Sequence, residues 1–175
     1  MTRIRVLSPV GQVLAENFTA PPLPADLQGL TIGFIDNTKH NFDRLADEIG
    51  TLLRERYGVK AVVRRRKGNA AMPAPPGTLA TLAKECDLVF AGSGDLGSCT
   101  SWSLHDAIEI AKIGTPAGLI GTTAFQGLAV SELGALGVSG LPLLVVQHPL
   151  GGERPESVTR KAHQAVEQLA SLIGK

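Results

Sequence analysis

One cysteine of this sequence lies where the chain can make a thiol reactive. Cys99 belongs to the glycine-rich segment Gly92–Ser101, GSGDLGSCTS, at the start of a predicted helix. Unpaired amide N–H groups and the positive end of the helix dipole favour a thiolate there. Such a thiolate can act as a nucleophile or as a redox group. The alternative is a small buried residue that caps a turn, because free cysteines are often buried.

Polar side chains elsewhere in the chain complement this thiol. His148 is a candidate general acid or base, since imidazole titrates near neutral pH; the alternative is a histidine that caps a strand end. Asp36 and Asp95 are candidates for orienting groups or moving protons. The residues expected to bind substrate are Asn37, Gly94, Gly97, Ser98, Thr100, Ser101, Thr122 and Thr123. Thr122 and Thr123 equally suit a helix N-cap.

Other local patterns give weaker signals. The G-x-G-x-x-G match at Gly92–Gly97 follows the third predicted strand rather than the first, and no acidic residue ends the next strand. Both facts argue against a dinucleotide. The basic run at 64–67, RRRK, is either a solvated strand end or a clamp for a carboxylate or phosphate. Two cysteines and four histidines without ligand spacing predict no zinc site. We therefore expect no metal and no cofactor.

Composition limits the classes of function. The chain has 175 residues, 43% of them hydrophobic and 19% charged, with a net charge of +1. This balance suits one globular domain and argues against nucleic acid or an anionic membrane as partner. No secretory signal or membrane-length apolar run is visible, so we expect a cytoplasmic protein with a small-molecule substrate. Cys86 opens the third predicted strand, far from Cys99, and is interpreted as a structural cysteine without a disulfide.

Strand and helix patterns alternate along most of the chain. Strands are predicted at 31–36, 59–65, 86–92, 115–121 and 140–148. Helices are predicted at 42–58, 78–85, 101–114, 122–137 and 155–175. This alternation predicts a flavodoxin-like or Rossmann-like, doubly wound, parallel five-stranded sheet, with strand order 2-1-3-4-5.

The domain organisation follows from the same pattern. Residues 30–175 are interpreted as a single α/β domain, and residues 1–29, rich in proline near their end, as an extended N-terminal arm. The arm must cover the domain or a partner subunit, so we expect a homo-oligomer. Because ligands bind beyond the carboxyl ends of parallel strands, the loops after the strands are expected to form one site.

The stretch GDLGSCTSWSLHDAIEIAKIGTPA resembles the signature of the UGSC family, named for selenocysteine or cysteine followed by Gly-Ser-Cys. Further segments resemble the family, among them VLSPVG, TIGFIDNTKHN, RRRK, ECDLVFAGSGD and QHPLGG. The resemblance covers nearly the whole chain and implies thiol or selenol chemistry at this loop. More distantly, such a motif is similar to that of selenoprotein subunits of the glycine and proline reductases.

This sequence departs from the family pattern at one position. Leu96 stands where the family has selenocysteine or its first cysteine. A dithiol redox cycle needs two chalcogens, and only Cys99 remains. The leading hypothesis is therefore a cysteine-dependent enzyme, of hydrolase, lyase or transferase type, with Cys99 as nucleophile. The alternatives are a subunit of a reductase-like complex that a partner chain completes, and a non-catalytic module that binds a small metabolite.

Overall fold

The computed structural model describes residues 17–173. Most of the predicted arm, residues 1–16, lies outside the described residues. Its remainder contains a two-residue strand, β1 (Phe18–Thr19), which pairs in parallel with β6 (Val138–Ser139). Leu27, near the end of the predicted arm, is buried in the core. The segment from 18 to 29 is thus packed on the domain.

A parallel five-stranded sheet forms the centre of the molecule. Its strands are β2 (Thr31–Asp36), β3 (Ala61–Arg66), β4 (Leu88–Gly94), β5 (Ala117–Thr122) and β7 (Leu143–Val146). Their order is β3-β2-β4-β5-β7, and every neighbouring pair is parallel. This arrangement confirms the predicted doubly wound α/β fold and the strand order 2-1-3-4-5.

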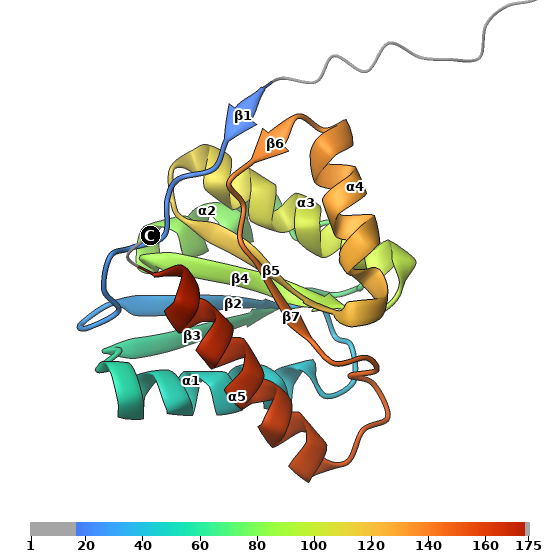
Figure 1. Ribbon diagram of the computed structural model, residues 1–175. Helices are drawn as coiled ribbons and strands as arrows, with labels where there is room; N and C mark the ends of the chain where they lie inside the picture. The colour runs from blue at the N-terminus through green and yellow to red at the C-terminus, as the bar shows by residue number, and fades with distance from the viewer. Residues whose placement is uncertain (1–16, 174–175) are drawn as a thin grey trace, which may run out of the picture.

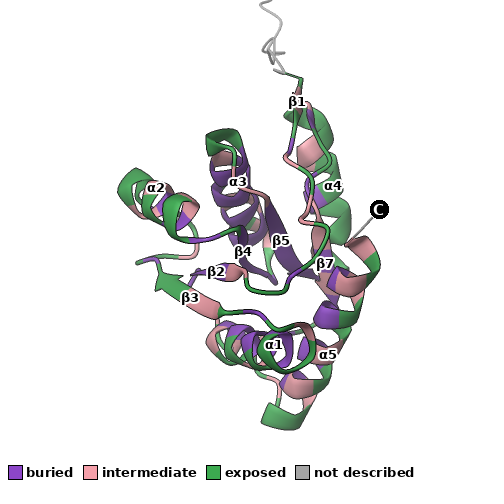
Figure 2. Cartoon of the chain, turned by 90° about the vertical axis from the view of Figure 1, so that its left-hand side faces the viewer, coloured by how far each residue is buried: buried purple, intermediate pink, exposed green. Residues whose placement is uncertain are grey.

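Helices cover both faces of this sheet, in three layers (Figure 1). The helices are α1 (Phe42–Tyr57), α2 (Pro76–Glu85), α3 (Gly97–Ile113), α4 (Gln126–Ala135) and α5 (Pro155–Leu172), with a short 3-10 turn η1 (Thr123–Phe125). One apolar core lies between the sheet and α1 with α5, and a second lies on the face of α2 and α3. Because both faces are covered, the central strands β4 and β5 are buried along their whole length (Figure 2).

The structure differs from the predictions mainly at element ends. The third helix begins at Gly97 rather than at 101, so Cys99 lies inside its first turn. The last predicted strand, 140–148, is reduced to β7, and the predicted helix 122–137 begins only after Thr122 has completed β5. β6 was not predicted, because a two-residue strand has no periodicity to recognise.

The carboxyl ends of the strands bring the site loops together. Gly92 near the end of β4 approaches the first residue of α1: a Cβ added at this glycine would lie 2.5 Å from the Phe42 ring. Only glycine permits so close an approach. The loops after β2 and β4 consequently meet where the strand order reverses, the location at which ligands bind in such sheets.

Candidate active site

Cys99 is buried in the first turn of α3 and bonded to the backbone there. Its Sγ accepts a hydrogen bond from the Leu96 N–H at 3.1 Å and lies 3.2 Å from the Leu96 carbonyl oxygen, to which the thiol donates. The residue has 0% exposure. Leu96 is the N-cap of the helix, and its own side chain offers no capping oxygen. The thiol therefore plays the part that the third helical residue has in a capping box, where its side chain accepts the N–H of the N-cap residue.

Leu96 occupies the outer position of the same turn. Its side chain is 52% exposed, while the sulfur three residues later is enclosed. Residues at the N-cap and at the third helical position lie next to each other, as the bonds between Leu96 and Cys99 demonstrate. In the pattern that the sequence resembles, the outer position carries selenium or sulfur. This chain presents leucine to the solvent there and keeps only the inner thiol.

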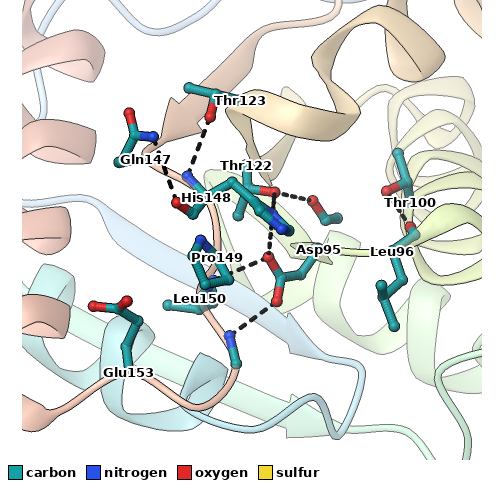
Figure 3. Close-up of polar contacts among 12 residues, drawn as sticks. Asp95, Leu96, Thr100, Thr122, Thr123, Gln147, His148, Pro149, Leu150 and Glu153 are labelled. Carbon is teal, nitrogen blue, oxygen red and sulfur yellow. Dashed lines mark hydrogen bonds and ion pairs between the residues drawn. The ribbon is translucent and has the colours of Figure 1, made fainter.

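His148, which follows β7, is held by Thr122 at the end of β5 and by Asp95 directly after β4 (Figure 3). Its Nδ1 lies 3.0 Å from the Thr122 hydroxyl and 3.1 Å from Asp95 Oδ1. The Thr122 hydroxyl donates to the Gly94 carbonyl at 3.3 Å, so its oxygen can accept a hydrogen bond from Nδ1–H. A carboxylate beside Nδ1 also favours the proton on that nitrogen.

The Nε2 atom of His148 is consequently the free nitrogen of the ring. No described residue bonds to it, and the side chain is 34% exposed. The Phe125 ring lies beside the imidazole, with ring centroids 5.8 Å apart. The backbone N–H of His148 donates to the Thr123 hydroxyl at 3.1 Å. In the Nδ1–H tautomer Nε2 is an acceptor, and such a nitrogen can take a proton from a bound molecule.

Asp95 also fixes the loop that carries His148. Its two carboxylate oxygens accept the N–H groups of Leu150, at 3.0 Å, and Gly151, at 2.9 Å. Asp95 is 7% exposed, and these charge-assisted bonds compensate the loss of water around its charge. The predicted catalytic candidates Asp95 and His148 are therefore brought together, although neither sequence spacing nor a motif connects them.

Two residues that the sequence reasoning missed secure the other end of this loop. The Asn41 amide donates to the carbonyls of Leu150 and Glu153, both at 3.0 Å. Lys161, 4% exposed, donates to the Pro149 carbonyl at 2.8 Å and pairs with Glu153 at 3.2 Å. Hydrogen bonds from Ser157 and Lys161 lower the pKa of the Glu153 carboxyl. A lysine on the apolar side of the predicted helix 155–175 was the signal available in the sequence.

Asp36 and Asn37 lie at the end of β2 and are fully buried. Asp36 pairs with Arg64 at 3.0 Å and accepts the Thr38 N–H at 2.8 Å. The Asn37 amide donates to the Ser93 carbonyl and to the Ser103 hydroxyl. These bonds connect β2 to β4 and α3. Both side chains are used within the protein, and their predicted roles toward a substrate remain predictions.

The remaining predicted binding residues divide into buried and accessible groups. Thr100 is buried, and its hydroxyl donates to the Leu96 carbonyl at 2.6 Å. The Ser101 hydroxyl is bonded to Glu132 of α4. Ser98 is exposed and Gly97 half-buried in the first turn of α3. Thr122 occupies the N-cap position of η1, as the alternative interpretation expects, but its hydroxyl makes no capping hydrogen bond, and the N-cap of α4 is Phe125.

The basic run 64–67 is solvated at Arg64, Arg65 and Arg66, as the first of the two interpretations predicts, and buried at Lys67. Each of its members has an acidic partner: Arg64 pairs with Asp36 and Asp47, Arg65 with Glu85, Arg66 with Asp36, and Lys67 with Asp106. The last pair is buried, with its atoms 2.6 Å apart and side-chain exposures of 1% and 0%. The charges thus join β3 to its neighbours, and only Arg66, with a 3.7 Å contact, is loosely held.

An open groove of about 800 Å³ lies beside the start of α1, next to these loops. Its walls include three basic and three acidic side chains: Lys39, Arg44, Arg66, Asp43, Asp47 and Glu48. The balance of charge selects neither anions nor cations. His40 of this groove accepts the Gly152 N–H at 3.4 Å, which places the groove against the His148 loop.

Cys86 lies apart from these loops, at the amino end of β4. Burial, followed by the negative charges of Glu85 and Asp87, raises the pKa of its thiol to about 11. Both cysteines are free. Within residues 17–173, no three acidic, histidine or cysteine side chains cluster as a metal site, and no helix is long and apolar enough to cross a membrane.

Comparison with known proteins places this chain in a family. Among solved structures, a flavodoxin-like domain from Synechococcus sp. is 14% identical, with a TM-score of 0.41; the match covers 81% of this chain and 99% of the other. An FMN-dependent NADH-azoreductase from Bacillus anthracis in complex with FMN is 9% identical, with the same TM-score and coverages of 83% and 99%. No curated protein matches the sequence. Residues 5–175, nearly the whole chain, match the UGSC family, and the chain belongs to that family.

Proposed function

We propose that this chain is an enzyme that acts on a small molecule at the carboxyl edge of its sheet, with His148 as the acid–base group. One observation carries the proposal: His148 Nδ1 lies against both Asp95 and Thr122, at 3.1 and 3.0 Å. This contact sets the tautomer and orients the ring, while Nε2 stays available. Histidines supported in this way transfer protons to and from bound substrates.

The first turn of α3 supplies the second half of the proposed site. Its N-cap, Leu96, follows Asp95 directly. The free N–H groups of the first turn form the positive end of the helix dipole. Developing negative charge on a substrate is stabilised by such groups. Abstraction of a proton by His148 would create that charge, so the two halves complement each other.

Covalent catalysis by Cys99 is a second candidate. The observation that favours it is the Leu96 N–H, which donates to Sγ at 3.1 Å and would stabilise a thiolate. The Cys99 sulfur is enclosed by the first turn of α3, and this burial opposes its direct attack on a substrate. A chalcogen from a partner chain, approaching at the exposed Leu96, would meet the same enclosure.

The test of the acid–base proposal needs no known substrate. Purified protein is incubated with a mixture of small metabolites, and consumption is followed by mass spectrometry. Replacement His148→Gln is expected to slow consumption by roughly 10²–10⁴-fold. The matched control is His163→Gln on α5, where the ring contacts Arg56. Consumption at the wild-type rate by His148→Gln would refute the role of His148.

The same experiment separates the alternatives. Cys99→Ala, with Cys86→Ser as background, abolishes consumption if Cys99 is the nucleophile and leaves most of it if the thiol only caps α3. Alkylation by iodoacetamide adds a direct readout, because an enclosed thiol reacts slowly until the chain unfolds. Tight binding of a metabolite without its consumption by any variant would favour the non-catalytic module.

A further inference from the structure

The chain on both sides of His148 lies at the edge of the sheet. β7 is the last strand in the order β3-β2-β4-β5-β7, and in the part of the chain that the structure describes it pairs with β5 alone. The backbone groups on its outer side therefore have no strand to bond. Pro149, directly after His148, has no N–H to contribute to a sheet. The position of His148 consequently depends on hydrogen bonds from side chains.

Gln168 of α5 takes the place of the missing strand at Val145. Its Oε1 accepts the Val145 N–H at 2.8 Å, and its Nε2 donates to the Val145 carbonyl at 2.6 Å. A side-chain amide carries the same kinds of donor and acceptor as a peptide group, so one glutamine supplies both bonds that a neighbouring strand would supply. These bonds hold the backbone three residues before His148.

Lys161 of the same helix holds the chain after His148. Its buried Nζ donates to the Pro149 carbonyl at 2.8 Å, and its charge is paired with Glu153 at 3.2 Å. Positions 161 and 168 of α5 are about two helical turns apart, so the two side chains leave the helix on the same side. One helix thus holds the backbone both before and after His148.

We propose that Gln168 and Lys161 are positioning residues for His148. By holding the backbone on both sides of it, they place the imidazole where Nδ1 meets Asp95 and Thr122, at 3.1 and 3.0 Å. Both act through the backbone, and hydrogen bonds weaken steeply when their atoms separate, so a displaced backbone would release the ring. The consequence for catalysis rests on the acid–base role proposed above, whereas the effect on the ring can be measured without turnover.

The test is ¹⁵N NMR of the imidazole nitrogens at about pH 8, where imidazole is ordinarily neutral. The signals of His148 are identified by their absence from His148→Gln. We expect the wild type to show a proton on Nδ1 and none on Nε2. Gln168→Ala is expected to lose this single tautomer, so that the two nitrogen signals shift toward each other. Gln168→Glu keeps the acceptor for the Val145 N–H but not the donor, and should show a smaller shift.

Two controls separate positioning from a general loss of stability. Gln164→Ala changes an exposed glutamine of the same helix, beside the same hollow, whose amide has no partner among the described residues. Ile49→Ala removes a buried side chain of α1 from the core shared with α5 and lowers the stability of the fold. Both variants should keep the wild-type signals of His148 while folded, whereas Lys161→Met should lose them.

The possible results distinguish this proposal from the proposed function. Wild-type ring signals in both Gln168→Ala and Lys161→Met, or a wild-type ring that is not protonated at Nδ1, would overturn the positioning role. A loss of the tautomer in Ile49→Ala as well would do the same, because any weakening of the fold would then suffice. Consumption at the wild-type rate by His148→Gln would refute the acid–base role alone, and the altered ring signals of Gln168→Ala would still support positioning.

Discussion

The carboxylate of Asp95 lies 3.1 Å from His148 Nδ1 and, through its two oxygens, also accepts two backbone N–H groups of the loop after β7. One side chain thus fixes both the orientation of the imidazole and the path of the chain that carries it. Replacement of Asp95 should therefore lower the stability of the fold as well as any activity that depends on His148.

Asp95→Ala is expected to destabilise the fold by about 3 kcal/mol, because it leaves the N–H groups of Leu150 and Gly151 without their charged acceptor. The measurement is urea denaturation near neutral pH. Asp26→Ala is the matched control: its carboxylate also accepts two N–H groups, those of Leu27 and Gln28, but in an exposed loop. Its expected cost is about 1 kcal/mol. Equal costs for both variants would contradict the anchoring role of Asp95.

The fold was predictable because its signals are local. Short apolar runs such as 31–36 and the periodicity of 42–58 identify a buried strand and an amphipathic helix without knowledge of the remainder. The alternation then leaves few topologies. The start of α3 was misplaced because Gly97, Ser98 and Cys99 are poor helix formers, and the bonds of the Cys99 thiol to Leu96 compensate for this.

The site was predictable in its location but not in its contacts. The strand order alone brings Asp95 and His148 to one edge of the sheet. Asp95, and not Asp36, contacts His148 because of the paths of the loops that follow β4 and β7. The spacing of residues in the sequence does not reveal these paths. The burial of Lys67 could not be predicted for a similar reason. Its partner Asp106 lies in α3, and no motif or spacing in the sequence connects the two residues.

Leu96→Cys is expected to restore a reversible disulfide with Cys99. The bonds between Leu96 and the sulfur show that the two positions are adjacent in the first turn of α3. An oxidant such as diamide would take up two electrons as the two thiols join, and dithiothreitol would reverse the reaction. The measurement is a thiol count in denaturant: one free thiol, that of Cys86, should remain after oxidation.

Ser98→Cys is the control for this pairing. Ser98 is exposed in the same turn but adjacent in sequence to Cys99, where the geometry of a disulfide is unfavourable. Under the same mild oxidation, the Ser98→Cys variant should keep all three of its thiols in the fraction that is not cross-linked to a second chain. If Leu96→Cys also kept all its thiols, the two positions would not be adjacent in solution.

Lys67→Met is expected to cost about 3–5 kcal/mol of stability, because it leaves the Asp106 carboxylate buried without its cation. The double variant Lys67→Met with Asp106→Leu should recover part of the loss, although the Ala74 N–H then lacks its acceptor. Urea denaturation measures the free energy of unfolding of the wild type and of each variant. Lys112→Met, which breaks the exposed pair with Glu109, should cost less than about 1 kcal/mol. A similar cost for both lysines would mean that the Lys67 pair is solvated.

The raised pKa of Cys86 predicts a loss of stability in alkali. The folded chain keeps the Cys86 proton up to about pH 11, whereas the unfolded chain releases it near the ordinary value of 9.0. Between these values the folded state binds more protons, so the free energy of unfolding must fall as the pH rises, by about 2 kcal/mol across the window. Cys86→Ala removes this dependence and leaves the titration of other groups in place. The difference between wild type and variant, measured by urea denaturation at pH 8 and pH 11, isolates the thiol; a constant difference would show that Cys86 ionises equally in both states.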